Sequence, residues 1–157
     1  MLMSPCCTLH TPIGTIRLVA GKDGLDSLSW DGDAILAQDP DNPHLLLAKE
    51  ELKQYFAGKL RTFTVPVDFS RWQGFTAQVY IALRAVPYGE TITYGELARR
   101  AGQPAAARAV GGIMARNPLP IILPCHRVIA ANGTMTGYSG GAGIPTKVFL
   151  LNHEKVS

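Results

Sequence analysis

Residues 93–116 read TYGELARRAGQPAAARAVGGIMAR, and this stretch decides the fold of the second half of the chain. Thr93, with Glu96 three positions later, fits a capping box, in which the hydroxyl and the carboxylate satisfy backbone amides at the start of a helix. We expect that helix to end at Gly102 and a second helix to run from Ala105 to Arg116. Two short helices joined by a tight turn that contains glycine predict a helix-turn-helix.

The second of these helices carries small side chains along one surface. Alanine or glycine fills most positions from 105 to 115, and Arg108 stands in the middle of them. Small residues let a helix backbone lie close against another surface, although tight packing inside the protein explains them equally well. A long cation with nothing bulky beside it favours a surface that meets phosphates, which arginine binds through paired hydrogen bonds.

The arginines are concentrated in the middle of the chain. Residues 71–137 hold seven arginines, no lysine and two glutamates, whereas residues 1–70 hold six basic and nine acidic side chains. The whole chain has a net charge of only +3, and hydrophobic residues make up 46% of it, which is a globular composition. The arginine-rich segment suits contact with a nucleic acid, and an ordinary solvated face is the alternative.

The first part of the chain predicts a small sheet followed by a helix. Residues 8–30 alternate apolar and polar side chains around a turn, which is typical of β structure. Asn42 is placed to cap a helix that Gly58 ends. We therefore expect an α/β (α+β) fold. Residues 1–70 form an N-terminal α/β unit with a structural role, and residues 71–157 form a mainly helical domain with the helix-turn-helix and a reactive cysteine.

The candidate nucleophile lies in an apolar stretch. Residues 119–130 read LPIILPCHRVIA and are expected to form a buried strand, interrupted by PCHR at 124–127. A cysteine beside a histidine and an arginine is in the setting that lowers a thiol pKa, and the thiolate is the nucleophilic form. A buried structural cysteine next to a satisfied histidine is the alternative. Ser139 does not match the Gly-x-Ser-x-Gly nucleophile motif, which leaves Cys125 as the candidate. A last helix is expected from Pro145 through Leu151.

The remaining cysteines predict neither a disulfide nor a metal site. Cys6 and Cys7 are adjacent and Cys125 lies far away, so no disulfide framework can be drawn. Cys6, Cys7, His10 and His44 together could hold a zinc ion, but adjacent cysteines lack the usual spacing of zinc ligands. We therefore read Cys6 and Cys7 as two thiols of a loosely ordered tail and expect no metal or cofactor. No run approaches the roughly 18 apolar residues of a membrane helix. The N-terminus does not look like a signal peptide, so we expect a cytoplasmic protein without membrane contact.

Six motifs follow one another from about residue 75 to residue 154: PYG at 87–89, TYG at 93–95, AARAVG at 106–111, RNP at 116–118, PCHRV at 124–128 and LLNHE at 150–154. In these motifs the chain closely resembles the O6-alkylguanine-DNA alkyltransferases, also called methylated-DNA–protein-cysteine methyltransferases. The first 70 residues fit that family's N-terminal unit. The resemblance implies repair of alkylated double-stranded DNA, in which O6-alkylguanine is flipped out of the duplex and its alkyl group passes irreversibly to Cys125. O4-alkylthymine as a second substrate is left open. A monomer is expected, and cooperative binding to DNA is left open.

The resemblance also implies how the reaction proceeds. Cys125 is the nucleophile, and His126, acting through a water molecule and oriented by Glu154, removes its proton. Tyr94 crowds the phosphate beside the lesion and donates a proton to the departing guanine. Asn117 braces the backbone of the site.

The same resemblance implies a mode of DNA binding and a substrate pocket. Arg108 takes the place of the flipped base, and the small residues around it let the helix enter the minor groove; these are Ala107, Ala109 and Gly111. The pocket is implied to be lined by Met114, Pro120, Val128, Tyr138 and Ser139. The loop at 140–147 is about two residues longer than is usual in the family, and Phe149 stands where a tryptophan is common. The loop change alters the expected shape of the pocket wall and with it the alkyl group that fits.

Three other functions remain to be weighed. A non-enzymatic relative would bind lesions and flag them, but such proteins lack the reactive cysteine. A helix-turn-helix regulator would need base-reading side chains on its second helix, which here is mostly alanine and glycine. A cysteine hydrolase would leave the basic helix pair unexplained.

Overall fold

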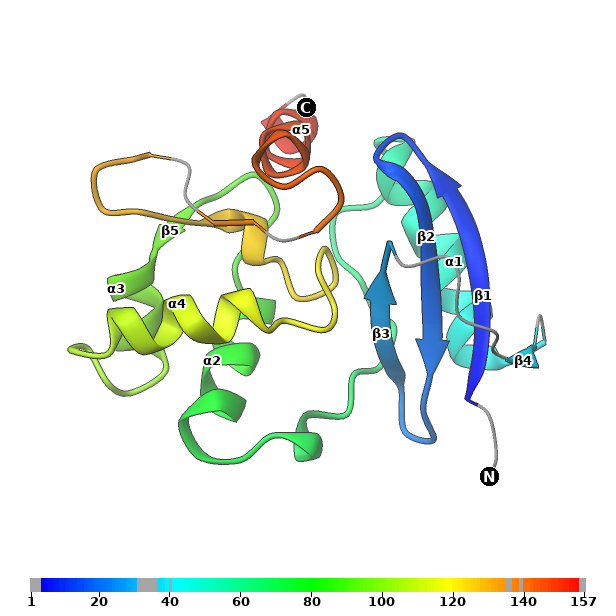
Figure 1. The fold of residues 1–157 in the computed structure, drawn as a ribbon, viewed down its shortest axis with the longest axis horizontal. Coiled ribbons are helices and arrows are strands. Elements are labelled where there is room, and N and C mark those ends of the chain that lie inside the picture. The colour runs from blue at the N-terminus through cyan, green and yellow to red at the C-terminus, as the bar shows by residue number, and fades with distance from the viewer. Residues whose placement is uncertain (1–3, 31–36, 40, 135–136, 139, 156–157) are drawn as a thin grey trace. The chain divides into compact units, whose positions relative to one another are not determined.

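The N-terminal unit is built on a four-stranded sheet. In the computed structural model, which describes residues 4–30, 37–39, 41–134, 137–138 and 140–155, the sheet has the order β3-β2-β1-β4 (Figure 1). The strands are β1 (Pro5–Thr11), β2 (Gly14–Ala20), β3 (Leu25–Ser29) and β4 (Ala37–Gln38). The first three pair antiparallel and β4 runs parallel to β1. The β structure predicted for residues 8–30 is confirmed.

Alternation along β1 and β2 explains how the sheet buries one of its faces. Cys7 and Leu9 of β1 lie opposite Leu18 and Ile16 of β2, and all four are buried. Cys6, whose side chain points to the other face of the pleat, is buried as well. The expected loosely ordered tail is therefore wrong from Pro5 onwards, because pairing with β2 fixes the backbone of this segment.

Helix α1 (Pro43–Phe56) packs against the sheet and begins and ends as its sequence predicts. The side chain of Asn42 accepts hydrogen bonds from the first-turn amides of His44 and Leu45. Gly58, at a φ of 76°, follows the helix in the left-handed conformation that glycine adopts without strain. The carboxylate of Glu51, buried on this helix, accepts amide hydrogens from Thr64 and Val65, so the chain leaving α1 is tied back onto it.

The chain divides into two compact units, Met1–Asp68 and Phe69–Ser157. The second unit begins with a short 3₁₀ helix, η1 (Phe69–Arg71), and contains the helices α2 (Gly74–Arg84), α3 (Tyr94–Arg100), α4 (Ala107–Ala115) and α5 (Ile144–Lys155). A further 3₁₀ helix is η2 (Cys125–Arg127), and a parallel pair of two-residue strands is formed by β5 (Ile92–Thr93) and β6 (Val128–Ile129). Within the part of the chain that the structure describes, no helix has the length and apolar character to cross a membrane.

Helices α3 and α4 pack together as the predicted helix-turn-helix. Thr93 caps α3 by accepting a hydrogen bond from the amide of Glu96 at 3.0 Å. The reciprocal half of the expected capping box is absent, because the Glu96 carboxylate turns to Arg99 and Arg100, to which it is ion-paired on the helix surface. Helix α4 runs from Ala107 to Ala115, with Ala106 and Arg116 as its caps, so it is shorter at both ends than the predicted 105–116.

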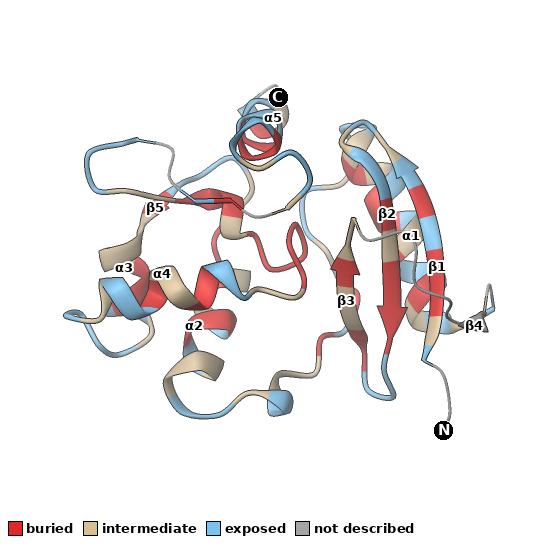
Figure 2. Ribbon diagram, viewed as in Figure 1, coloured by how far each residue is buried: buried red, intermediate tan, exposed pale blue. Residues whose placement is uncertain are grey.

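The segment before the reactive cysteine differs most from expectation. Residues 119–123 form buried turns and not a strand, and Figure 2 shows this loop as a continuous buried stretch. Ile121 has a φ of 77°, which no strand permits, and the amide of Leu123 bonds the carbonyl of Leu119. The predicted strand 119–130 survives only as Val128–Ile129. The last helix is longer than expected, running to Lys155.

Candidate active site

Cys125 opens the short helix η2 and is partly exposed. Its amide donates to the carbonyl of Leu123 at 2.7 Å, and its own carbonyl accepts from the amide of Val128, the residue that ends the turn. The amide of Arg127 donates to the carbonyl of Pro124 at 2.9 Å. The cysteine therefore sits on a tightly bonded turn whose backbone leaves its side chain little freedom to move away.

Asn117 fixes the loop that leads to this turn. Its side-chain amide donates to the carbonyl of Leu123 at 2.8 Å, while its side-chain oxygen accepts from the amide of Leu119 at 2.9 Å. One side chain thus joins the two ends of the buried loop. The bracing role that the family resemblance implies for Asn117 stays a prediction, and these contacts are the ones on which it would depend.

The parallel pair of β5 and β6 connects the reactive turn to the helix-turn-helix. Ile92 lies opposite Val128, and Thr93 lies opposite Ile129. Thr93 is also the N-cap of α3. The residue that starts the helix-turn-helix is therefore paired with Ile129, which follows the reactive turn by two residues. This short ladder sets the position of the thiol relative to α3.

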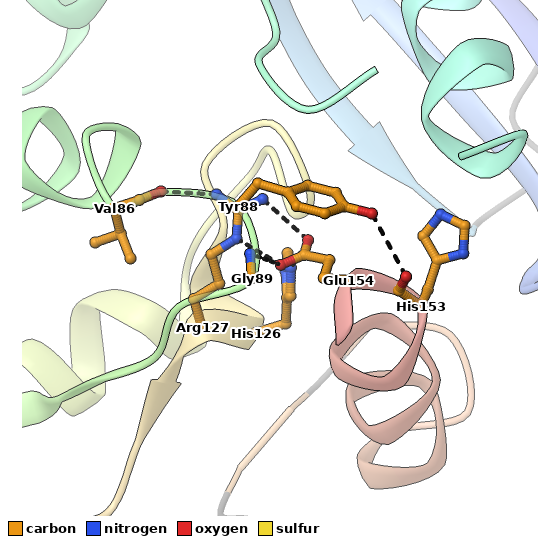
Figure 3. Close-up of polar contacts among 7 residues, drawn as sticks. All are labelled: Val86, Tyr88, Gly89, His126, Arg127, His153 and Glu154. Carbon is orange, nitrogen blue, oxygen red and sulfur yellow. Dashed lines mark hydrogen bonds and ion pairs between the residues drawn. The ribbon is translucent and has the colours of Figure 1, made fainter. Parts of the chain in front are cut away.

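Behind the turn, a buried ionic cluster gathers on the carboxylate of Glu154, in α5 (Figure 3). Nε2 of His126 lies 2.6 Å from one carboxylate oxygen. The guanidinium of Arg127 donates to both oxygens, at 2.8 and 2.9 Å, and the amide of Gly89 donates a longer bond of 3.3 Å. Arg127 also donates to the carbonyl of Val86 at 2.7 Å. The cluster joins α5, η2 and the turn that follows α2.

The cluster controls the ionisation of its own members. Burial opposes the ionisation of Glu154, but hydrogen bonds from His126 and Arg127 outweigh it and hold the pKa of the carboxyl far below its ordinary value. Burial lowers the pKa of His126, and the charges of Arg127 and Lys147 lower it further, against the opposing influence of Glu154. His126 is therefore uncharged near neutral pH and able to accept a proton.

The thiol of Cys125 does not have the pKa that the sequence suggested. Burial raises the pKa of Cys125, and what opposes the rise is a hydrogen bond from Asn117 together with the charge of Lys147. The expectation of a thiol pKa lowered by its neighbours His126 and Arg127 is wrong, because both of those side chains turn toward Glu154. Nucleophilic attack by Cys125 would consequently need a base that removes the thiol proton.

Lys147 is a residue of this site that the sequence gave no reason to select. It lies in the first turn of α5 with an exposed fraction of 0%, and its ammonium donates to the carbonyl of Val128 at 2.8 Å. Burial lowers the pKa of Lys147, and the thiolate of Cys125 raises it. A lysine four positions after a glycine-rich loop resembles any surface lysine in sequence, so no local signal reports its burial.

The surface of α4 is as bare as predicted. Arg108 and Ala109 are exposed, and Ala107 and Gly111 are partly exposed. A β-carbon built on Gly111 would meet nothing within 4 Å, so packing inside the protein does not account for this glycine. Tyr94, the first residue of α3, is also partly exposed.

Four of the five residues assigned to the substrate pocket are buried in the second unit: Met114, Pro120, Val128 and Tyr138. Burial, followed by the charge of Cys125, raises the pKa of Tyr138, so this phenol is neutral and lies within electrostatic range of the thiol. Its hydroxyl has no hydrogen-bond partner among the described residues. The fifth residue, Ser139, lies outside the described residues.

His10 and His44 each contact a neighbouring oxygen atom of the N-terminal unit. A ring nitrogen of His10 lies 2.8 Å from the hydroxyl of Thr15, and one of His44 lies 3.4 Å from the carbonyl of Lys22. Over the described ranges, no three residues among His, Cys, Asp and Glu are grouped so that they could hold a metal ion.

Fold and site together define a class of protein: a helix-turn-helix unit that carries a partly exposed cysteine, with a buried Arg–Glu–His cluster behind it. Residues 74–156 match the family described as "6-O-methylguanine DNA methyltransferase, DNA binding domain". Residues 6–69 match "6-O-methylguanine DNA methyltransferase, ribonuclease-like domain". The chain belongs to the 6-O-methylguanine DNA methyltransferase family.

Individual relatives are similar over nearly the whole chain. The methylated-DNA–protein-cysteine methyltransferase of Mycobacterium bovis is 49% identical, over 94% of this chain and 90% of the relative. The constitutive enzyme of that name from Bacillus subtilis is 37% identical, over 96% of this chain and 94% of the relative. Among solved structures, Mycobacterium tuberculosis OGT in complex with DNA matches with a TM-score of 0.81 and 43% identity, over 96% of this chain and 92% of that one.

Proposed function

We propose that this protein repairs alkylated DNA directly, by moving the alkyl group of O6-alkylguanine onto Cys125. The observation that carries the proposal is that Cys125, a partly exposed residue, lies in the same unit as the bare surface of α4. Membership of the family and the names of the similar methyltransferases support it. Partners are expected to be duplex DNA and no membrane, and the protein to be a cytoplasmic monomer.

The approach to DNA is assigned to α4. Ala107, Ala109 and Gly111 let the helix lie close to the sugar-phosphate walls of the minor groove, and the exposed Arg108 fills the space left by the flipped base. An enzyme that acts on a base must take it out of the stack at a cost of a few kcal/mol. A side chain that replaces the lost stacking offsets part of that cost.

The transfer step is assigned to Cys125, His126 and Glu154. His126 accepts the thiol proton through a water molecule, and the thiolate attacks the alkyl carbon. The carbon–oxygen bond breaks, and its electron pair leaves with the guanine, which takes a proton from Tyr94. The product is a thioether on the protein and an unmodified guanine in the DNA. Because no chemistry in the site breaks a thioether, each molecule acts once.

The remaining assignments follow the same scheme. Asn117 braces the loop below the thiol, and its hydrogen bond favours the thiolate. The alkyl group and the guanine lie against Met114, Pro120, Val128, Tyr138 and Ser139. The unit of residues 1–70 has a structural role, and residues 71–157 bind DNA and carry out the transfer.

Intact mass spectrometry after incubation with a duplex that contains one O6-methylguanine tests the proposal. The expected result is restored guanine together with a gain of roughly 14 Da on Cys125, because a methyl group replaces the hydrogen of the thiol. Protein that stays unmodified while it binds the lesion tightly indicates a lesion-flagging protein. Absence of both modification and lesion preference indicates a helix-turn-helix regulator.

A further inference from the structure

We propose that Arg127 is a positioning residue for alkyl transfer: by holding Glu154 in a forked ion pair it keeps His126 uncharged, with Nδ1 as the nitrogen that accepts a proton. The inference rests on the proposed function, in which His126 is the base. It assigns to Arg127 a task beyond holding the site together.

The geometry places Arg127 and His126 on the same carboxylate. Arg127 is 5% exposed and binds both oxygens of Glu154, at 2.8 and 2.9 Å, while a third bond of 2.7 Å anchors it to the carbonyl of Val86. His126 is 0% exposed and lies 2.6 Å from one of those oxygens. Figure 3 shows the carboxylate between the two side chains. The guanidinium is thus fixed at three points, with its charge against the group that His126 contacts.

The balance of charges in the cluster explains how Arg127 keeps His126 neutral. A buried carboxylate without a cation strongly favours a proton nearby, because an isolated charge away from water is costly. Arg127 supplies the compensating charge, so Arg127, Glu154 and a neutral His126 sum to zero. A protonated His126 would leave one positive charge buried, beside Lys147, which comes from the same helix as Glu154. Burial and these two cations outweigh Glu154, and the pKa of His126 is accordingly lowered.

The same contacts decide which ring nitrogen of His126 carries the hydrogen. An ionised carboxylate only accepts hydrogen bonds, so the nitrogen that faces Glu154, Nε2, must be the donor. Nδ1 then carries a lone pair, and within the described residues it has no hydrogen-bond partner. A free lone pair on the residue that follows Cys125 is what a general base requires.

Replacing Arg127 by methionine removes this compensation in a predictable way. The cluster then takes up one proton near neutral pH. If the proton goes to His126, both ring nitrogens carry hydrogen. If it goes to Glu154, the carboxyl donates to Nε2, and the hydrogen of the neutral ring moves to Nδ1. In both cases Nδ1 no longer accepts a proton.

Nitrogen NMR of the His126 ring in the full-length protein measures this directly. In wild type we expect Nδ1 to be unprotonated at pH 7, and in Arg127→Met we expect it to be protonated. Arg127→Lys, which restores the positive charge, should return Nδ1 to the unprotonated state. Arg99→Met, which removes an exposed arginine of α3, is the matched control and should leave the His126 signals unchanged.

Alkyl transfer to the free base O6-methylguanine, followed against pH, is the second measurement. The acidic limb of the rate profile should move to higher pH in Arg127→Met, by about one unit or more, the usual effect of a nearby charge. An unprotonated Nδ1 in folded Arg127→Met overturns the inference. A charged His126 in wild type at pH 7 also overturns it, and that measurement stands even where the methionine variant fails to fold. If Nδ1 has the same protonation in wild type and Arg127→Met, the role proposed for Arg127 is wrong. If Nδ1 differs as expected but the wild-type protein transfers no alkyl group, only the proposed function is wrong.

Discussion

The hydroxyl of Tyr80, in α2, donates a hydrogen bond of 2.9 Å to the carbonyl of Ile113, in α4. Tyr80 is 2% exposed, and burial raises its pKa to about 12, so the phenol stays protonated and can always donate. The ring of Trp72 packs against the ring of Tyr80, with centroids 4.5 Å apart. This hydrogen bond ties α2 to α4, the helix to which DNA binding is assigned.

Tyr80→Phe should destabilise the protein by about 1 kcal/mol, the net worth of one buried hydrogen bond. The ring and its packing remain, so the loss comes from the hydroxyl alone. Urea unfolding measures it. Tyr88→Phe is the control, because the Tyr88 hydroxyl reaches the carbonyl of His153 only at 3.4 Å and is partly exposed. Equal losses in the two variants would argue against a special tie between α2 and α4.

Arg108→Ala should reduce repair of a duplex by tenfold or more, which corresponds to about 1.4 kcal/mol of activation free energy. Reaction with free O6-methylguanine should change little, since no base has to leave a stack. The ratio of the two rates, measured by transfer of a labelled methyl group, separates extrusion from chemistry. Similar losses on both substrates would contradict the assigned role of Arg108.

Asn117→Ala should move the reactivity of Cys125 to higher pH. The variant loses the hydrogen bond that lowers the thiol pKa, and burial, which raises it, remains. It should also cost about 1–3 kcal/mol in stability, because the amide of Leu119 loses its partner and the carbonyl of Leu123 keeps only its bond from the amide of Cys125. Iodoacetamide labelling of the Cys125 peptide against pH gives the first quantity. Asn152→Ala, at an exposed position of α5, should leave the labelling profile of wild type unaltered.

Glu154→Gln should lose about 3 kcal/mol or more of stability at pH 7, the usual result of removing one partner of a buried ion pair. The pKa of Glu154 is depressed in the folded protein, so its contribution is fully present above the ordinary value of 4.5 and is lost as the pH falls below it. The difference between wild type and variant should therefore shrink between pH 4.5 and more acidic conditions.

Unfolding free energies at several pH values check this dependence. Glu50→Gln is the matched control, since Glu50 lies on the exposed side of α1 and contacts Gln54. A difference for Glu154→Gln that stays constant with pH would mean that the charge of Glu154 is not what stabilises the cluster.

Local chemistry explains which elements could be predicted. Asn42 and Thr93 cap their helices through contacts within three residues, and the glycines at 58 and 102 follow the same helices at positive φ. Such signals lie entirely within a short stretch of sequence. The helix-turn-helix and α1 depend on them and were predicted, and turn residues at 21–24 likewise indicated the turn between β2 and β3.

Contacts between distant segments explain what could not be predicted. Residues 119–123 read as a strand because a short apolar run fits a strand or any buried segment equally well. Their turns depend on Asn117, which bonds both ends of the loop. The thiol pKa was misjudged for the same reason, because His126 and Arg127 are neighbours of Cys125 in sequence but partners of Glu154 in space.

Ile121 is a β-branched residue in the left-handed region, at a φ of 77°. Holding such a residue there costs roughly 1–3 kcal/mol, which glycine would avoid. Ile121 is nevertheless only 1% exposed, and burial of an isoleucine side chain stabilises the fold by a comparable amount. In the loop that precedes Cys125, the conformational strain at Ile121 is therefore offset by burial of its apolar side chain. Replacing Ile121 by glycine would therefore ease the turn but leave a cavity in the core of the second unit.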